Sequence, residues 1–136
     1  MSKKFIRMYS LIIVVSLIVS GCSFKQTRGN NNDLGIKRIT SEEAKEIIDS
    51  GEKVTIIDVR EENEYSEGHI RNSILVPLGK IESNIDNIVK DKEEPILVYC
   101  RSGRRSAEAA SKLNELGYKK VYDFGGIIEW KYDIEK

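Results

Sequence analysis

Two short apolar runs constrain the fold of this chain more than any other feature. Residues 54–58 (VTIID) and 96–99 (ILVY) are rich in apolar side chains, and each is too short for a helix, so both are predicted to be buried strands. Segments with helical spacing lie between and after them. Strands that alternate with helices predict an α/β fold in which a parallel sheet is covered on both faces.

The segments around these two strands are assigned from the residues at their ends. Thr40-Ser41-Glu42-Glu43 forms a capping box ahead of a helix that ends near Gly51. Apolar residues at helical spacing, closed by Gly117, predict another helix that starts near Ala107. The remaining predicted elements are a short polar helix at 61–66, a strand at 74–76, a helix at 81–89, a strand at 121–123 and a last helical turn at 127–132.

The first 22 residues have the pattern of an export signal. Three basic residues precede an apolar stretch at 11–19 that is too short to span a membrane. Ser20-Gly21-Cys22 follows and resembles a bacterial lipobox, which implies diacylation of Cys22 and a lipid anchor on the outer side of the cytoplasmic membrane. An uncleaved signal anchor or a buried leader helix is the alternative. The predicted organisation is a lipoprotein signal peptide at 1–21, the lipidated Cys22 with a flexible tether at 22–35, and a folded domain at 36–136.

Charge and composition argue against several kinds of partner. Because three of the 22 basic residues precede the apolar run, the rest of the chain carries 19 basic and 22 acidic residues, and no basic face for a nucleic-acid backbone is evident. The two cysteines, Cys22 and Cys100, and the single histidine, His69, are too few for a usual four-ligand zinc site. A disulfide between the two cysteines is the alternative that this count leaves open, and acylation of Cys22 would remove it.

Cys100 lies where ligands of an open parallel sheet are usually bound. It directly follows the 96–99 strand and opens the segment Cys100-Arg101-Ser102-Gly103-Arg104-Arg105-Ser106, which leads into a helix. Successive backbone N–H groups and the positive helix end stabilise a thiolate at such a place and lower its pKa, and a glycine lets the loop curl. A cysteine packed in the core is the alternative, and the three arginines argue against it.

Four stretches of the sequence together resemble the rhodanese family. The Cys100 loop matches that family's Cys-Arg-x-Gly-x-Arg-Ser motif, and the resemblance extends over residues 39–132. It implies a small rhodanese-like α/β fold, with a parallel sheet of about five strands and helices on both faces. It also implies transfer of a sulfane sulfur through a Cys100 persulfide, with no metal ion and no organic cofactor. The other matching stretches are Asp58-Val59-Arg60, Tyr65 with Gly68-His69-Ile70, and Gly125-Gly126 with Trp130.

The residues of the loop have candidate roles in binding a donor. By the resemblance, Arg105 helps to form an anion pocket, and a purely structural ion pair is the alternative. Arg101 and Arg104 either attract an anionic donor or are simply solvated. Ser102 and Gly103 complete the predicted substrate-binding loop.

Five residues outside the loop have predicted roles as well. Asp58 and Arg60 leave their strand at the same sheet edge as Cys100, which makes them candidates for the pocket. Asp58 is expected to be mainly a structural acceptor, and solvent exposure is the alternative for Arg60. His69 is expected to fix local geometry rather than to act as a base, and Trp130 and Tyr132 are expected to cover the core.

The sequence therefore predicts a sulfurtransferase that takes sulfur from a small anion, thiosulfate or a persulfide, and passes it to a thiol or to cyanide. A cysteine-dependent phosphatase or arsenate reductase is one alternative. Such relatives have a loop longer by one residue, whereas Arg105 follows Cys100 by only five positions. The other alternative is a noncatalytic module that binds sulfur species or docks a partner.

Overall fold

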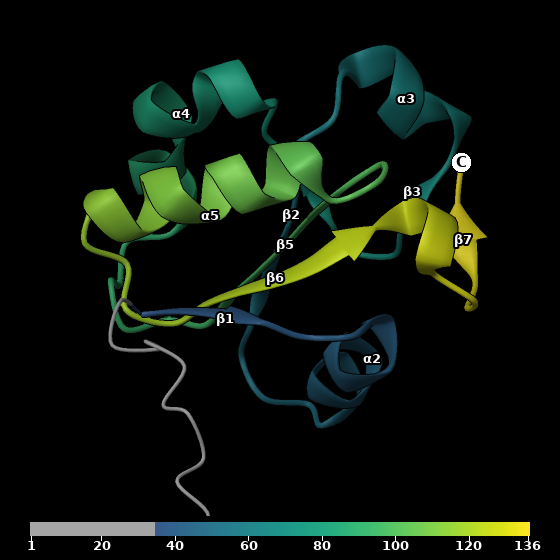
Figure 1. Cartoon of the computed structure of the whole chain (residues 1–136), viewed down its shortest axis with the longest axis horizontal. Helices are drawn as coiled ribbons and strands as arrows, with labels where there is room; N and C mark the ends of the chain where they lie inside the picture. The colour runs from purple at the N-terminus through teal and green to yellow at the C-terminus, as the bar shows by residue number, and fades with distance from the viewer. Residues whose placement is uncertain (1–34) are drawn as a thin grey trace, which may run out of the picture. The chain divides into compact units, whose positions relative to one another are not determined.

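The structure is a computed structural model that describes residues 35–136, so the predicted signal peptide and Cys22 lie outside it. Its framework is a five-stranded parallel sheet with the strand order β1-β6-β5-β2-β4. Helices lie on both faces, which confirms the predicted α/β fold (Figure 1). The strands are β1 (Ile36–Arg38), β2 (Thr55–Asp58), β4 (Ile74–Leu75), β5 (Ile96–Cys100) and β6 (Val121–Gly126).

The helices of the described chain connect these strands, and the first of them begins at the predicted capping box. Thr40 caps α2 (Ser41–Asp49): its Oγ1 accepts a hydrogen bond from the N–H of Glu43 at 3.1 Å, and Glu43 Oε2 accepts the N–H of Thr40 at 2.8 Å. No helix within residues 35–136 has the length and apolar character needed to cross a membrane. The other helices are α3 (Glu62–Glu67), α4 (Ile81–Ile88) and α5 (Arg104–Glu115), with 3-10 turns at η1 (Leu78–Lys80) and η2 (Ile127–Glu129).

The two predicted apolar strands lie in the interior of the sheet. All five residues of β5 are buried, as are the last three of β2, because the sheet is covered on both faces. The two strands pair in register, with Asp58 opposite Tyr99. The carboxyl end of β2 therefore lies next to the carboxyl end of β5, where Cys100 is the last strand residue.

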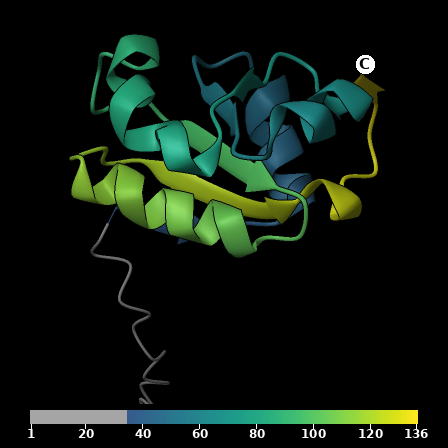
Figure 2. The ribbon, with the colours of Figure 1, turned by 90° about the horizontal axis from the view of Figure 1, so that it is seen from above.

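Each face of the sheet has its own hydrophobic core. Helices α4 and α5 lie side by side over one face, and α2 lies over the other (Figures 1 and 2). Successive residues of β5 contribute to the two cores in turn: Val98 faces α4 and α5, whereas Leu97 and Tyr99 belong to the core on the α2 side. This alternation explains why the strand is a continuous apolar run.

The carboxyl-terminal segment differs from the prediction. The helical turn expected at 127–132 ends at Glu129, and the chain continues into β7 (Ile134–Glu135), which pairs antiparallel with β3 (His69–Ile70). Trp130 is half-buried and packs against the core on the α2 side. Tyr132 is 37% exposed, so the prediction that it covers the core is wrong. The reason is that no helix continues to hold this side chain against the sheet.

Candidate active site

Cys100 lies inside a backbone loop that leads from β5 into α5. It is a free thiol with only 1% of the residue exposed, and the N–H of Gly103 donates to its Sγ at 3.0 Å. Gly103 has a φ of 103°, a left-handed conformation that favours glycine, and it is the N-cap residue of α5. The helix therefore begins at Arg104, three residues before the predicted Ala107, and its first turn forms part of the loop.

The surroundings of the thiol lower its pKa. Burial acts to raise the pKa of Cys100, because it disfavours the charged thiolate. The backbone N–H groups of Ser106, Gly103 and Ser102 act in the opposite direction, together with the Ser106 hydroxyl, and the net pKa lies below that of an ordinary cysteine. The loop thus favours a negatively charged sulfur at this position.

The carboxyl end of β6 supports the loop through backbone contact. A β-bulge near the end of β5 places Cys100 opposite Gly126. A Cβ atom on Gly126 would lie 2.1 Å from the carbonyl oxygen of Arg101, so only glycine fits at this crossing. The buried Ser106 hydroxyl donates to the carbonyl oxygen of Gly125 at 3.2 Å, which ties α5 to the same strand. The Gly-Gly pair of the sequence therefore has a structural role behind the loop.

The three arginines of the loop segment have different environments. Arg101 and Arg104 are exposed, as is Ser102. Arg105 is instead half-buried, and its Nη1 and Nη2 donate to the two carboxylate oxygens of Glu64 at 2.7 and 2.8 Å. This is the ion pair that the sequence left open as the alternative for Arg105, and a role in an anion pocket stays a prediction.

Glu64 was not among the residues predicted for the site. It lies 41 positions before Arg105, in α3, and no local sequence pattern links the two. The only signal was its place in a short polar helix directly after the Asp58-Val59-Arg60 stretch.

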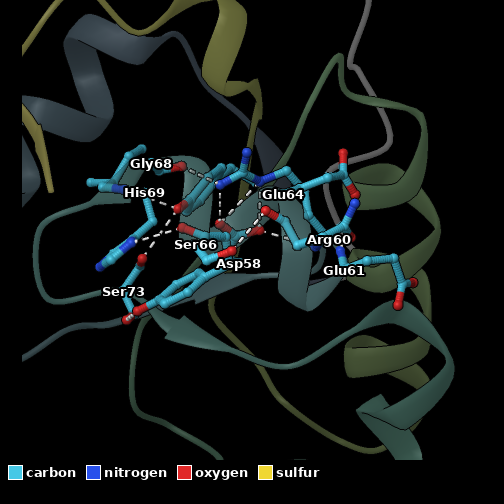
Figure 3. Close-up of polar contacts among 12 residues, drawn as sticks. Asp58, Arg60, Glu61, Glu64, Ser66, Gly68, His69 and Ser73 are labelled. Carbon is cyan, nitrogen blue, oxygen red and sulfur yellow. Dashed lines mark hydrogen bonds and ion pairs between the residues drawn. The ribbon is translucent and has the colours of Figure 1, made fainter. Parts of the chain in front are cut away.

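Asp58 and Arg60 form a buried ion pair next to this helix (Figure 3). The guanidinium of Arg60 donates to Asp58 through Nε at 3.0 Å and Nη2 at 2.7 Å, and Nη2 also donates to the carbonyl oxygen of Gly68 at 2.8 Å. Asp58 is therefore an acceptor for an arginine, and the alternative that Arg60 is solvent-exposed is wrong. That Asp58 or Arg60 lines the substrate pocket stays a prediction.

A second set of polar contacts ties the segment after α3 to β5 (Figure 3). The Tyr99 hydroxyl accepts the N–H of Ile70 at 3.1 Å and lies 3.1 Å from Ser73 Oγ. Burial raises the pKa of Tyr99, so this hydroxyl stays neutral. Tyr65 donates its hydroxyl to the carbonyl oxygen of Ser73 at 2.7 Å, and the ring of His69 stacks on that of Tyr65 with 3.8 Å between centroids. These contacts hold His69 in a packed position beside the tyrosine.

The sequence and the fold both match one known family. The model of the rhodanese-like domain family matches residues 40–133. The chain belongs to this family. It is 38% identical to the putative sulfurtransferase YtwF of Bacillus subtilis, over 71% of this chain and 91% of that protein. It is also 38% identical to the thiosulfate sulfurtransferase GlpE of Coxiella burnetii, over 70% of this chain and 87% of that protein.

Solved structures agree with this assignment. A rhodanese-like domain protein from Staphylococcus aureus has a TM-score of 0.65 and 33% sequence identity, covering 73% of this chain and 96% of that one. A rhodanese from E. coli, solved with anions, has a TM-score of 0.59 and 34% identity, covering 61% of this chain and 98% of that one. The protein is thus a rhodanese-type sulfurtransferase.

Replacing Gly126 with Ala should distort the loop, because the added Cβ collides with the backbone carbonyl of Arg101. We expect the rate of sulfur transfer from thiosulfate to cyanide to fall by at least about tenfold. Gly79→Ala is the matched control, since an added Cβ there meets no atom within 4 Å. A G126A protein that transfers sulfur at the parent rate would show that this crossing does not set the loop geometry.

Replacing Asp58 with Ala should destabilise the fold, because the guanidinium of Arg60 then stays buried without its carboxylate. We expect the free energy of unfolding to fall by about 3 to 5 kcal/mol, as for other broken buried ion pairs. Asp49→Ala breaks the more exposed pair with Lys45, and we expect a loss of about 1 kcal/mol or less. Urea unfolding followed by circular dichroism measures both, and equal losses would contradict the prediction.

Proposed function

We propose that the protein is a thiosulfate or persulfide sulfurtransferase in which Cys100 carries the sulfur as a persulfide. The observation behind this proposal is that Cys100 is buried inside a loop of backbone N–H groups. The N–H of Gly103 donates a hydrogen bond to its Sγ at 3.0 Å. The similarity to GlpE of Coxiella burnetii, which is named a thiosulfate sulfurtransferase, supports the same class of donor.

The first half-reaction forms the persulfide. The thiolate of Cys100 attacks the sulfane sulfur of thiosulfate, a new S–S bond forms, and the S–S bond of the donor breaks with its electron pair leaving on sulfite. A persulfide donor reacts in the same way and releases a thiolate. The terminal sulfur now carries the negative charge, and the N–H groups that lower the pKa of Cys100 are the donors available to stabilise it.

The second half-reaction returns the enzyme to its starting state. A thiolate or cyanide attacks the terminal sulfur of the persulfide and forms a bond to it. The S–S bond to Cys100 breaks, and its electron pair returns to the cysteine as a thiolate. Neither half-reaction as written uses a metal ion or an organic cofactor.

The loop supports sulfur transfer over phosphatase or arsenate reductase chemistry. Arg105 follows Cys100 by five positions, one fewer than the spacing of cysteine-dependent phosphatases. Both of its Nη atoms donate to Glu64, whose negative charge offsets the guanidinium charge that would otherwise hold a phosphate or arsenate oxyanion. A single persulfide sulfur needs less space within the loop than a phosphate group does.

The reaction takes place, on this proposal, outside the cytoplasmic membrane, with the chain anchored through a lipid on Cys22. The basic start, the short apolar stretch at 11–19 and the Ser20-Gly21-Cys22 sequence support this location. The acceptor would then be a thiol presented on that side of the membrane.

Cys100→Ser should abolish sulfur transfer, because a hydroxyl at nearly the same volume cannot carry a sulfane sulfur. The parent, mixed with thiosulfate, should gain the mass of one sulfur atom and lose it again on addition of cyanide. The variant should gain none, while its melting temperature shows that the fold is intact. A C100S protein that still transfers sulfur would remove Cys100 from the mechanism, and a parent that hydrolyses aryl phosphates well would favour the phosphatase alternative.

Cys22→Ala should prevent lipidation. In cells grown with a palmitate analogue, we expect the parent to carry the label in the membrane fraction and the Cys22 variant to carry none. Cys100→Ser is the matched control, because it also removes one cysteine and should be labelled like the parent. An unlabelled parent that stays in the membrane at full length would indicate a signal anchor instead.

A further inference from the structure

Glu64 and Arg105 form a bidentate ion pair beside the Cys100 loop. The two N···O distances are 2.7 and 2.8 Å, and the side chains are only 22% (Arg105) and 18% (Glu64) exposed. Glu64 Oε2 also accepts the N–H of Glu61 at 3.0 Å, which fixes the carboxylate at the start of α3. Paired, partly buried charges in this geometry bind strongly and are screened less by salt than exposed ones.

The pair stays ionised at all physiological pH values. Hydrogen bonds from Arg105 lower the pKa of Glu64 to about 2. The pKa of Arg105 is raised, first by its hydrogen bonds to Glu64 and further by the charges of Glu64 and Cys100. Arg105 lies in the first turn of α5, which directly follows the loop that holds Cys100, so its charge acts on an anion at the sulfur. An anionic donor at Cys100 is therefore attracted by the positive charge of Arg105 and repelled by the negative charge of Glu64.

We propose that Glu64 determines the charge of the preferred sulfur donor: by neutralising Arg105, it makes the loop favour a singly charged persulfide over dianionic thiosulfate. This inference rests on the proposed function, because it concerns donors that react at Cys100. In both cases the thiolate attacks the sulfane sulfur and takes it over. The electron pair of the broken S–S bond leaves on a thiolate for the persulfide and on sulfite for thiosulfate.

The selectivity follows from how electrostatic energy depends on charge. The repulsion between the Glu64 carboxylate and a donor is proportional to the donor's charge, so a dianion experiences twice the repulsion of a monoanion in the same place. The other two cations of the loop, Arg101 and Arg104, are exposed, and solvent and salt weaken their attraction for an anion at the buried sulfur. The loop N–H groups carry no net charge and stabilise a negative sulfur in either donor.

Glu64→Gln tests the proposal, because it removes the charge while a glutamine at this position still accepts the N–H of Glu61. Glu62→Gln is the matched control: Glu62 is an exposed residue of the same helix, and within residues 35–136 it forms no ion pair. The rate constants for persulfide formation on Cys100 are measured by quenching the reaction at set times and recording the intact mass. The two donors are thiosulfate and the persulfide of 2-mercaptoethanol, whose single charge lies on the persulfide group. The readout is the ratio of the two rate constants in one protein, which a general loss of fold or activity does not change.

We expect the ratio of the thiosulfate to the persulfide rate constant to rise by at least about fivefold in E64Q and to stay at the parent value in E62Q. A ratio that stays unchanged in E64Q, with both rate constants falling together, would mean that Glu64 only holds Arg105 in place, and the proposal would be wrong. A parent that forms no persulfide with either donor would instead overturn the proposed function itself.

The double variant E64Q/R105Q separates an effect through Arg105 from any other effect of the substitution. Removing both charges leaves the pair neutral, as it is in the parent, so we expect the ratio to return to within about twofold of the parent value. A double variant that keeps the high ratio of E64Q would show that the carboxylate does not act by neutralising Arg105, and would overturn the proposal.

Discussion

At Gly126, the backbone of β6 comes so close to the Cys100 loop that only a hydrogen atom fits on the Cα atom between them. This contact fixes the position of the Arg101 carbonyl, and the loop then curls through Gly103 so that its N–H reaches the sulfur. Burial alone would raise the pKa of Cys100 and leave an inert core thiol. The converging N–H groups reverse this effect, so the reactivity of the cysteine depends on a contact between two backbone segments.

The position of α3 depends on a second constraint, the buried ion pair of Asp58 and Arg60. Pairs of this kind contribute little net stability, but breaking one is costly, and so they hold the segments that carry them in one arrangement. Arg60 also reaches the carbonyl oxygen of Gly68, just beyond α3, and Tyr99 holds the chain further on at Ile70. The segment between β2 and β4 is thus attached to the end of β2 through Asp58 and to the end of β5 through Tyr99.

The sequence predicted those parts of the fold that depend on a few neighbouring residues. A fully buried strand such as β5 needs only a continuous apolar run, and the start of α2 needs only the capping box at Thr40. The antiparallel pair β3 and β7 was missed because two-residue strands show no periodicity, and the start of α5 was misplaced because Gly103, not an apolar residue, determines it. For the site, the motifs predicted the cysteine loop, but the pairing of Glu64 with Arg105 is a tertiary contact across 41 residues.

The distribution of charge around Cys100 bears on both halves of the proposed reaction. The loop stabilises a negative sulfur through N–H dipoles, and this stabilisation is available to the thiolate and to the persulfide, because each places one negative charge within the same loop. A free arginine at the position of Arg105 would add attraction for every anion in the site, including the sulfite that must leave. With Glu64 paired to it, that attraction is largely cancelled, so the site stabilises the bound sulfur without retaining a dianionic product.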